Sequence, residues 1–211
     1  MAVRAILKWP SSKLRQVCDP VSDLSEAESI ARDLCDTMKV NFGAGLAASQ
    51  VGVKKSIVVI NDSSIRSLKP CSRVQGVCVL INPTIEVVGK EKFKWTEACL
   101  SVRDQSGTVS RYSNIVLTYQ NLDGETVVKN LRNEDAGIVQ HEVDHLSGRL
   151  FVDLLPSLEK RMIFNRLRKK FKKKKREATA AKKEHSAEMR KHLLRKKRKK
   201  RPPKKYGKRK K

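Results

Sequence analysis

Two histidines and a glutamate near residue 141 form the pattern with the clearest chemical meaning in this sequence. His141 and His145 are four residues apart, and Glu142 follows the first of them. On a helix, both imidazoles would share one face and could hold one divalent metal ion, with Glu142 beside it as a general base. A purely structural histidine pair is the alternative. The spacing therefore predicts a metal site, provided that the stretch is helical.

The flanking residues predict a helix over about 134–147. Asn133 is a favourable N-cap, and Glu134 and Asp135 place negative charge in the first turn, where the helix dipole favours it. Gly148 is the expected C-terminal stop.

A histidine pair supplies only two ligands, so a third must come from elsewhere. A metzincin would place a histidine at the position of Phe151. A thermolysin-like site would use a downstream glutamate, but Glu159 is close to the motif and the later ones lie in a lysine-rich segment (Glu177, Glu184 and Glu188). Neither protease pattern fits, and the third ligand is therefore expected upstream of the helix.

Net charge divides the 211 residues into two parts. Residues 157–211 contain 28 Lys and Arg against 4 Glu, a net charge of +24. The other residues hold 19 of the 47 basic and 18 of the 22 acidic side chains, a net charge of +1. The length allows one domain with a hydrophobic core and an appendage. We expect a near-neutral globular domain followed by a polycationic tail.

Cysteine usage and hydropathy bear on the compartment. The five cysteines are odd in number and scattered, without a C-x-x-C pair, which is typical of a reducing compartment. No apolar run approaches the roughly 18 residues that span a bilayer, and the N-terminus lacks the hydrophobic core of a signal peptide. We expect a cytoplasmic monomer without a membrane span, with an organelle of bacterial origin as the alternative location.

The chain before the histidine motif reads as an extended arm, one helix and then strands. The arm runs from Ile6 to Val21, and Asp23 opens a helix whose apolar stripe is expected in the core: Ile30, Leu34, Met38 and Phe42. Strands are predicted at 56–60 and 77–81, the second ending at Asn82-Pro83, with a loop at 61–76 between them. Two hairpins are predicted, one joining 85–88 to 93–95 and one joining 115–119 to 126–128 around Asp123-Gly124. Strands bracketed by helices indicate the α+β class.

Two further segments, each taken alone, are most simply interpreted as structural. The small residues of 43–50 suit a structural turn, and no lysine follows them as a phosphate loop would require. Cys99, like the other cysteines, is most simply a small buried hydrophobic residue.

Taken together, three segments carry more information than any one of them. Gly43–Gln50, Glu97–Ser101 and His141–Gly148 resemble the three signature motifs of peptide deformylases, in that family's order and at similar separations. The N-terminal arm and residues 109–111 are also similar, so the likeness covers residues 4 to about 165. It implies antiparallel sheets packed around a central metal-binding helix, in a catalytic domain of residues 1–165.

The resemblance implies a role for each matching residue of the metal site. Cys99 would be the third ligand, as a thiolate, beside His141 and His145. The family favours Fe²⁺, and Zn²⁺, Ni²⁺ or Co²⁺ can substitute. Glu142 would take a proton from the attacking water and return it to the leaving amine.

The resemblance also implies the substrate, which would be the N-formyl group on the initiator methionine of a nascent chain, released as formate. The Gln50 side-chain amide and the Leu100 backbone N–H would hold the oxyanion, and the Gly45 carbonyl would bind the substrate. Gly137 lies one turn before His141 and is expected to leave room for the methionine side chain, with simple helix packing as the alternative. The sequence departs from the family where Ala98 replaces a glycine, Arg103 a proline and Ser106 a basic residue.

The tail, residues 166–211, is predicted to be partly helical or disordered. Ser157 to Phe171 can continue as a helix with four apolar residues near one face (Leu158, Met162, Leu167 and Phe171). The cationic runs 172–176 and 195–201 are typical of disordered interaction arms, and Pro202-Pro203 excludes helix there. Ribosomal RNA is the expected polyanion, because a deformylase acts on chains leaving the ribosome. A nuclear-localisation signal is the alternative for residues 195–201, and an anionic membrane surface is a further alternative partner. For the whole chain, the alternative is a nucleic-acid- or ribosome-binding protein with a vestigial catalytic domain.

Overall fold

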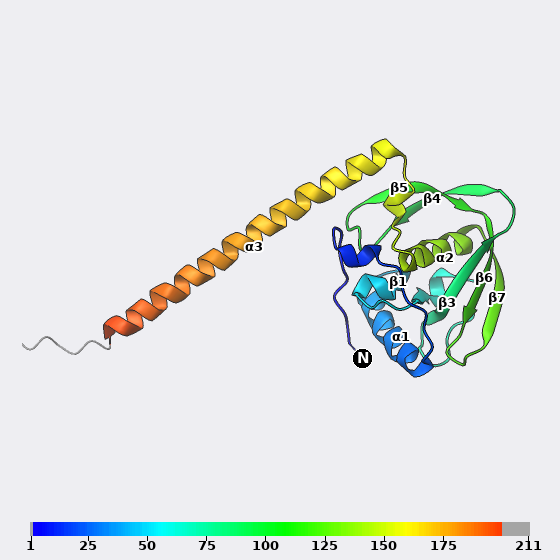
Figure 1. The fold of residues 1–211 in the computed structure, drawn as a ribbon, viewed down its shortest axis with the longest axis horizontal. Coiled ribbons are helices and arrows are strands. Elements are labelled where there is room, and N and C mark those ends of the chain that lie inside the picture. Colours follow the sequence, from blue (N-terminus) through cyan, green and yellow to red (C-terminus); the bar gives the residue numbers. More distant parts are fainter. Residues whose placement is uncertain (1, 200–211) are drawn as a thin grey trace, which may run out of the picture. The chain divides into compact units, whose positions relative to one another are not determined.

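The computed structural model describes residues 2–199. The chain divides into two compact units, Met1–Ile163 and Phe164–Lys211. The first unit contains helices α1 (Leu24–Val40) and α2 (Asn133–Leu146) and two antiparallel sheets (Figure 1). Four short 3₁₀ helices lie between the longer elements: Ser12–Arg15, Ala48–Val51, Asp62–Ser64 and Phe151–Asp153. The α+β class predicted from the sequence is confirmed.

The larger sheet has five strands in the order β1 (Gly45–Ala47), β2 (Ile57–Asn61), β3 (Val77–Val87), β6 (Asn114–Gln120) and β7 (Thr126–Arg132). Neighbouring strands are antiparallel throughout. Alternate residues face opposite sides, so Val59 and Val79 pack with α1 whereas Val58 and Leu80 pack with α2. The sheet therefore separates two hydrophobic clusters, and α2 lies on the face opposite α1.

One predicted hairpin is confirmed and the other is wrong. Strands β6 and β7 pair around Asp123-Gly124 as expected. By contrast β3 pairs with β6, whereas β4 (Lys92–Ala98) pairs with β5 (Ser106–Tyr112) in a separate two-stranded sheet. Gly89, with φ +76°, lies where the chain leaves one sheet for the other. Local sequence marks that turn but does not determine which strand each side pairs with.

Strand β3 continues past Asn82-Pro83, where the sequence predicted its end. Asn82 adopts φ +49°, and the register with β6 shifts between Ile81 and Thr84. The Asn82 side chain accepts a hydrogen bond from the Val21 N–H and donates one to the Val21 carbonyl, both at 2.8 Å. A bulge held by these bonds lets the strand resume instead of ending.

Helix α1 has the predicted start but a shorter buried stripe. Asp23 caps it by accepting from the N–H groups of Ser25 and Glu26. Leu34 and Met38 are fully buried, but Phe42 lies beyond the helix end with φ +54°, and the residue is 97% exposed. The prediction that Phe42 belongs to the core is wrong, because the helical period ends at Val40.

Helix α2 spans Asn133–Leu146, so it begins and ends one residue before the predicted range of about 134–147. Asn133 is its first residue, with φ +47°, and Arg132 occupies the cap position without a side-chain cap bond. At the other end Gly148 has φ +70°, and its N–H bonds to the His145 carbonyl while the Arg149 N–H bonds to the Asp144 carbonyl. This is a Schellman C-cap. The predicted glycine stop is confirmed, and the predicted Asn133 cap is wrong.

Helix α3 (Ser157–Lys199) crosses from the first unit into the second. The predicted helix at 157–171 is confirmed, but the run at 172–176 and residues 195–199 of the second run, both expected to be irregular, are helical. Lysine, arginine, glutamate and alanine are good helix formers, and Lys173 and Glu177 form an i,i+4 ion pair at 3.9 Å. Residues 200–201 and Pro202-Pro203 lie outside the described residues. None of the helices within residues 2–199 is long and apolar enough to cross a bilayer.

Candidate active site

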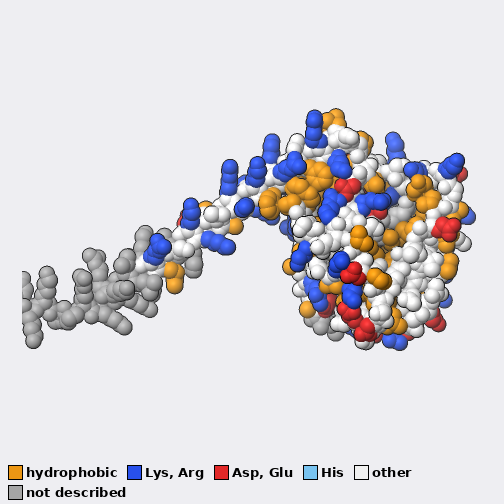
Figure 2. All heavy atoms as spheres, in the orientation of Figure 1, with side chains coloured by type: hydrophobic (Ala, Val, Ile, Leu, Met, Phe, Trp, Pro, Cys, Tyr) orange, Lys and Arg blue, Asp and Glu red, His pale blue; other side chains and the backbone are white. Residues whose placement is uncertain are grey.

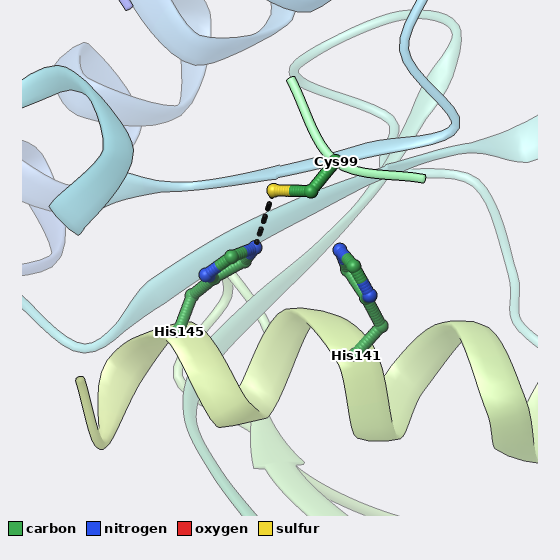
Figure 3. Close-up of side chains that lie close together, drawn as sticks. All are labelled: Cys99, His141 and His145. Atoms are coloured by element: carbon green, nitrogen blue, oxygen red, sulfur yellow. Dashed lines mark hydrogen bonds between the residues drawn. The ribbon is translucent and has the colours of Figure 1, made fainter. Parts of the chain in front are cut away.

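Three potential metal ligands meet above one face of α2. His141 and His145 project from successive turns of the helix towards Cys99, which follows β4 (Figure 3). The Cys99 Sγ is 3.3 Å from the His145 Nε2, and one donor atom from each of the three residues lies within 4.8 Å of the others. All three side chains are buried. Cys99 is thus brought to the histidine pair, whereas Glu159 does not join the cluster.

A carboxylate behind the cluster orients one histidine. Glu97 Oε2 lies 2.6 Å from the His141 Nδ1, so the other ring nitrogen, Nε2, faces the cluster. The two oxygens of Glu97 accept from Arg111 Nε and one of its terminal nitrogens at 2.6 and 3.0 Å, and Arg111 also donates to Asp144 at 2.6 Å. Such a carboxylate–histidine pair fixes the ring orientation of a metal ligand.

This ion-pair network was not predicted from the sequence. Glu97 and Arg111 were noted there only as parts of motifs, and Asp144 was given no role. One signal was available, because the alternation of β4 places Phe93, Trp95 and Glu97 on one side of the strand. A charged residue on the side that carries aromatic rings needs a partner, and Arg111 on β5 supplies it.

Contacts within the cluster shift the pKa values of Cys99 and His141. Burial alone would raise the pKa of the Cys99 thiol, but the adjacent His145 and His141 outweigh burial and hold that pKa well below its usual value. Burial would lower the pKa of His141, yet hydrogen bonds to Cys99 and Glu97 raise it well above normal. The arrangement therefore favours a thiolate at Cys99, the form that binds metals.

Glu142 lies beside the cluster with one oxygen unpaired. Burial raises the pKa of its carboxyl group, against the opposing effect of His141 and His145. Its Oε2 is buried and has no hydrogen-bond partner among the described residues. A Cβ added to Gly45 would come within 2.5 Å of the Glu142 Oε1, so the glycine lets the β1 backbone approach this carboxylate. A buried carboxylate with a spare acceptor oxygen can receive a proton from a water molecule in the cleft.

Gln50 and Leu100 lie beside the cluster and belong to the lining of the same cleft as Cys99 and His141. The Gln50 Oε1 accepts from the Ala47 N–H at 2.9 Å, and its Nε2 lies 3.2 Å from Ser101 Oγ and 3.5 Å from Cys99 Sγ. The turn after Cys99 is closed by the Val102 N–H bonding to the Cys99 carbonyl at 2.9 Å. That bond does not use the Leu100 N–H.

A cleft of about 740 Å³ opens over these residues. Its lining includes residues from all three sequence motifs: Gly43–Gly45 and Gln50 from the first, Glu97–Leu100 from the second, and His141 and Glu142 from the third. The volume lies within the range of small-molecule sites. Ala98, Arg103 and Ser106, where the sequence departs from the family pattern, also line it.

Gly137 lies against two aromatic side chains of β4. A Cβ at this position would meet Phe93 Cζ at 3.2 Å and the Trp95 indole at 3.4 Å. The lining of the cleft includes Trp95 and Ile138 but not Gly137. The space beside the glycine is therefore filled by two aromatic rings of β4, which supports the packing alternative.

Comparison with known proteins agrees with this geometry. The family model described as polypeptide deformylase matches residues 3–161. The peptide deformylase of Teredinibacter turnerae is 38% identical over 173 residues, covering 82% of this chain and 98% of that protein. That of Aquifex aeolicus is 36% identical over 171 residues, covering 81% and 98%.

Solved structures show the same likeness. The crystal structure of peptide deformylase from Ehrlichia chaffeensis superposes with a TM-score of 0.71 at 29% identity, covering 82% of this chain and 99% of that one. A structure of that enzyme in complex with actinonin also superposes with a TM-score of 0.71, at 31% identity, covering 81% and 98%. Family model, relatives and structures agree, and the chain belongs to the polypeptide deformylase family.

Proposed function

We propose that this protein hydrolyses the N-formyl group of formyl-methionyl nascent peptides, releasing formate and a free amine. Family membership supports the reaction class. The observation that carries the proposal is the cluster of Cys99, His141 and His145 next to Glu142, at a cleft that Cys99, His141 and Glu142 line. A vestigial domain would have no need to keep a complete ligand set beside a buried carboxylate with one unpaired oxygen.

The donor set fits a divalent metal. A thiolate and two imidazoles are common ligands of Zn²⁺ and Fe²⁺, and His141 is already held by Glu97 with its Nε2 facing the other donors. When bound, such an ion lowers the pKa of water and polarises a carbonyl, which a poorly electrophilic formamide needs. We propose Fe²⁺ as the physiological metal, with Zn²⁺, Ni²⁺ or Co²⁺ able to substitute.

The protein groups divide the remaining work. Glu142 accepts the proton of the attacking water through its unpaired oxygen and later donates it to the leaving nitrogen. The Gln50 amide and the Leu100 N–H stabilise the developing oxyanion, an effect typically worth a few kcal/mol. The Gly45 carbonyl accepts a hydrogen bond from the peptide. Glu142 is thereby the group on which turnover depends most directly.

The test is release of formate from a formyl-Met peptide by protein reconstituted anaerobically with Fe²⁺. We expect turnover with Fe²⁺ and slower turnover with Zn²⁺, and inactivation in air as Fe²⁺ or the Cys99 thiolate oxidises. An unformylated acetyl-Met peptide is the matched control. Absence of formate release with every metal would contradict the proposal.

We further propose that α3, the basic helix, docks on ribosomal RNA. Lysine and arginine side chains follow one another along the described part of α3 (Figure 2), and residues 157–211 carry a net charge of +24. Like charges this dense repel one another unless a polyanion neutralises them, and phosphate contact should dominate because aromatic residues are few. The monomeric state and a cytoplasmic location stay predictions.

A further inference from the structure

The N-terminal arm contacts both segments that carry the proposed oxyanion donors. The Leu7 N–H donates to the Gln50 carbonyl at 2.7 Å, and the Trp9 N–H donates to the Ser101 carbonyl at 2.9 Å. Between them the Lys8 Nζ lies 2.6 Å from the Leu100 carbonyl oxygen. The arm thus joins two segments that are about 50 positions apart in the sequence, and Lys8 is the residue whose side chain takes part.

The bond from Lys8 completes the restraint of Leu100. A peptide unit is planar and trans, so the Leu100 N–H points opposite to the Cys99 carbonyl in the same plane. The Val102 N–H holds that plane by its bond to the Cys99 carbonyl at 2.9 Å. Lys8 holds the next plane through the Leu100 carbonyl. Both peptide planes at Leu100 are therefore fixed, and with them the direction of its N–H.

The chemistry of Lys8 suits this task. A hydrogen bond from a charged ammonium group is roughly twice as strong as one between neutral groups. Lys8 is half-buried and belongs to the lining of the cleft, together with Gln50 and Leu100. Rigid donors that need no reorganisation during the reaction are what makes an oxyanion site effective.

We propose that Lys8 is a positioning residue that holds the Leu100 N–H in its oxyanion-binding direction. This inference rests on the proposed function, since the role of Leu100 belongs to it. Because the oxyanion exists only near the transition state, loss of Lys8 should act on kcat and leave KM nearly unchanged.

The test compares Lys8→Met, Lys8→Arg and Lys13→Met in the full-length, metal-loaded protein. Lys13 is an exposed lysine in the adjacent 3₁₀ helix and serves as the matched control. We expect Lys8→Met to lower kcat by about tenfold, less than the loss of an oxyanion donor itself. Lys8→Arg should retain most of the wild-type kcat, since a guanidinium can still donate to the Leu100 carbonyl. Lys13→Met should behave as wild type.

A second measurement does not depend on turnover. Hydrogen exchange of the Val102 amide should be faster in Lys8→Met than in wild type or Lys13→Met, because the turn loses its external support. An unchanged kcat and exchange rate in Lys8→Met would overturn the proposal. The proposal would also be overturned if Lys8→Met changed only KM, or if Lys8→Arg did not restore kcat. If the wild type itself releases no formate, the proposed function fails, while the exchange measurement still decides whether Lys8 holds the turn.

Discussion

Charged side chains are used in opposite ways at the cleft and along the basic helix. Around α2, Glu97 and Arg111 have side chains only 2% and 5% exposed, and each contacts its partners at 2.6–3.0 Å. On α3, the Lys173–Glu177 pair is 80% and 61% exposed and its atoms are 3.9 Å apart. A buried charge must be paired in a fixed geometry, whereas exposed charges are screened and act together.

The difference teaches that the two regions should respond differently to substitution. At the cleft each charged group has one task and one set of partners, so single changes should have large effects. Along α3 the charge is distributed, so single changes should matter little and several together should matter in proportion to their number. Four experiments test this contrast, beginning with the largest expected effect.

Cys99→Ala should have the largest effect, because it removes one of three donors whose atoms lie within 4.8 Å of one another. We expect metal content to fall and activity to be lost. Metal per protein after dialysis, measured by elemental analysis, is the direct readout. Cys35→Ala, in a buried cysteine on α1, should change neither quantity. Full metal content in Cys99→Ala would show that the ligand assignment is wrong.

Glu142→Gln should come next, with kcat lower by about 10²–10⁴-fold, the usual contribution of general acid–base catalysis. The metal content should stay at the wild-type value, since the three donors remain. Steady-state formate release measures the first quantity and elemental analysis the second. A Glu142→Gln protein with near wild-type turnover would remove Glu142 from the proposed role.

Glu97→Gln should lower metal affinity or activity by about 10–100-fold, as is typical when the residue that orients a metal-bound histidine is changed. It also removes one of the two carboxylates that pair with the buried Arg111. Glu28→Gln is the matched control, because the Glu28–Arg32 pair on α1 is partly exposed and should contribute little. Equal effects of the two substitutions would contradict the contrast between buried and exposed charges.

Replacing Lys172–Lys175 together with glutamine should have the smallest effect on catalysis. Activity on a short formyl-Met peptide should stay within about twofold, because these side chains are exposed and lie in the second unit. Co-sedimentation with ribosomes should weaken, and the log–log salt slope should fall by about one for each lost phosphate contact. Arginine at the same four positions should preserve binding. Unchanged co-sedimentation in the glutamine variant would count against docking through this helix.

Much of the site could be predicted from residues that are close together in the sequence. The spacing of His141 and His145 places both on one face of any helix, and Gly148 ends that helix because only glycine adopts φ +70° there without strain. The charge difference between 1–156 and 157–211 is likewise a property of composition alone. Cys99, Gln50 and Leu100 were predicted as site residues because whole motifs resemble those of a family, and periodicity would not have indicated them.

Only the tertiary structure decided the contacts between residues that are far apart in the chain. Long-range packing decides that β3 pairs with β6 and not with β4. It also brings together the ion-pair network of Glu97, Arg111 and Asp144, and it places aromatic rings beside Gly137. The exposure of Phe42 depends on where α1 ends, and the bond from Lys8 to Leu100 depends on how the arm crosses the site. Local sequence sets the direction of a side chain on its own helix or strand, but its partner is set by which other segments fill the space opposite.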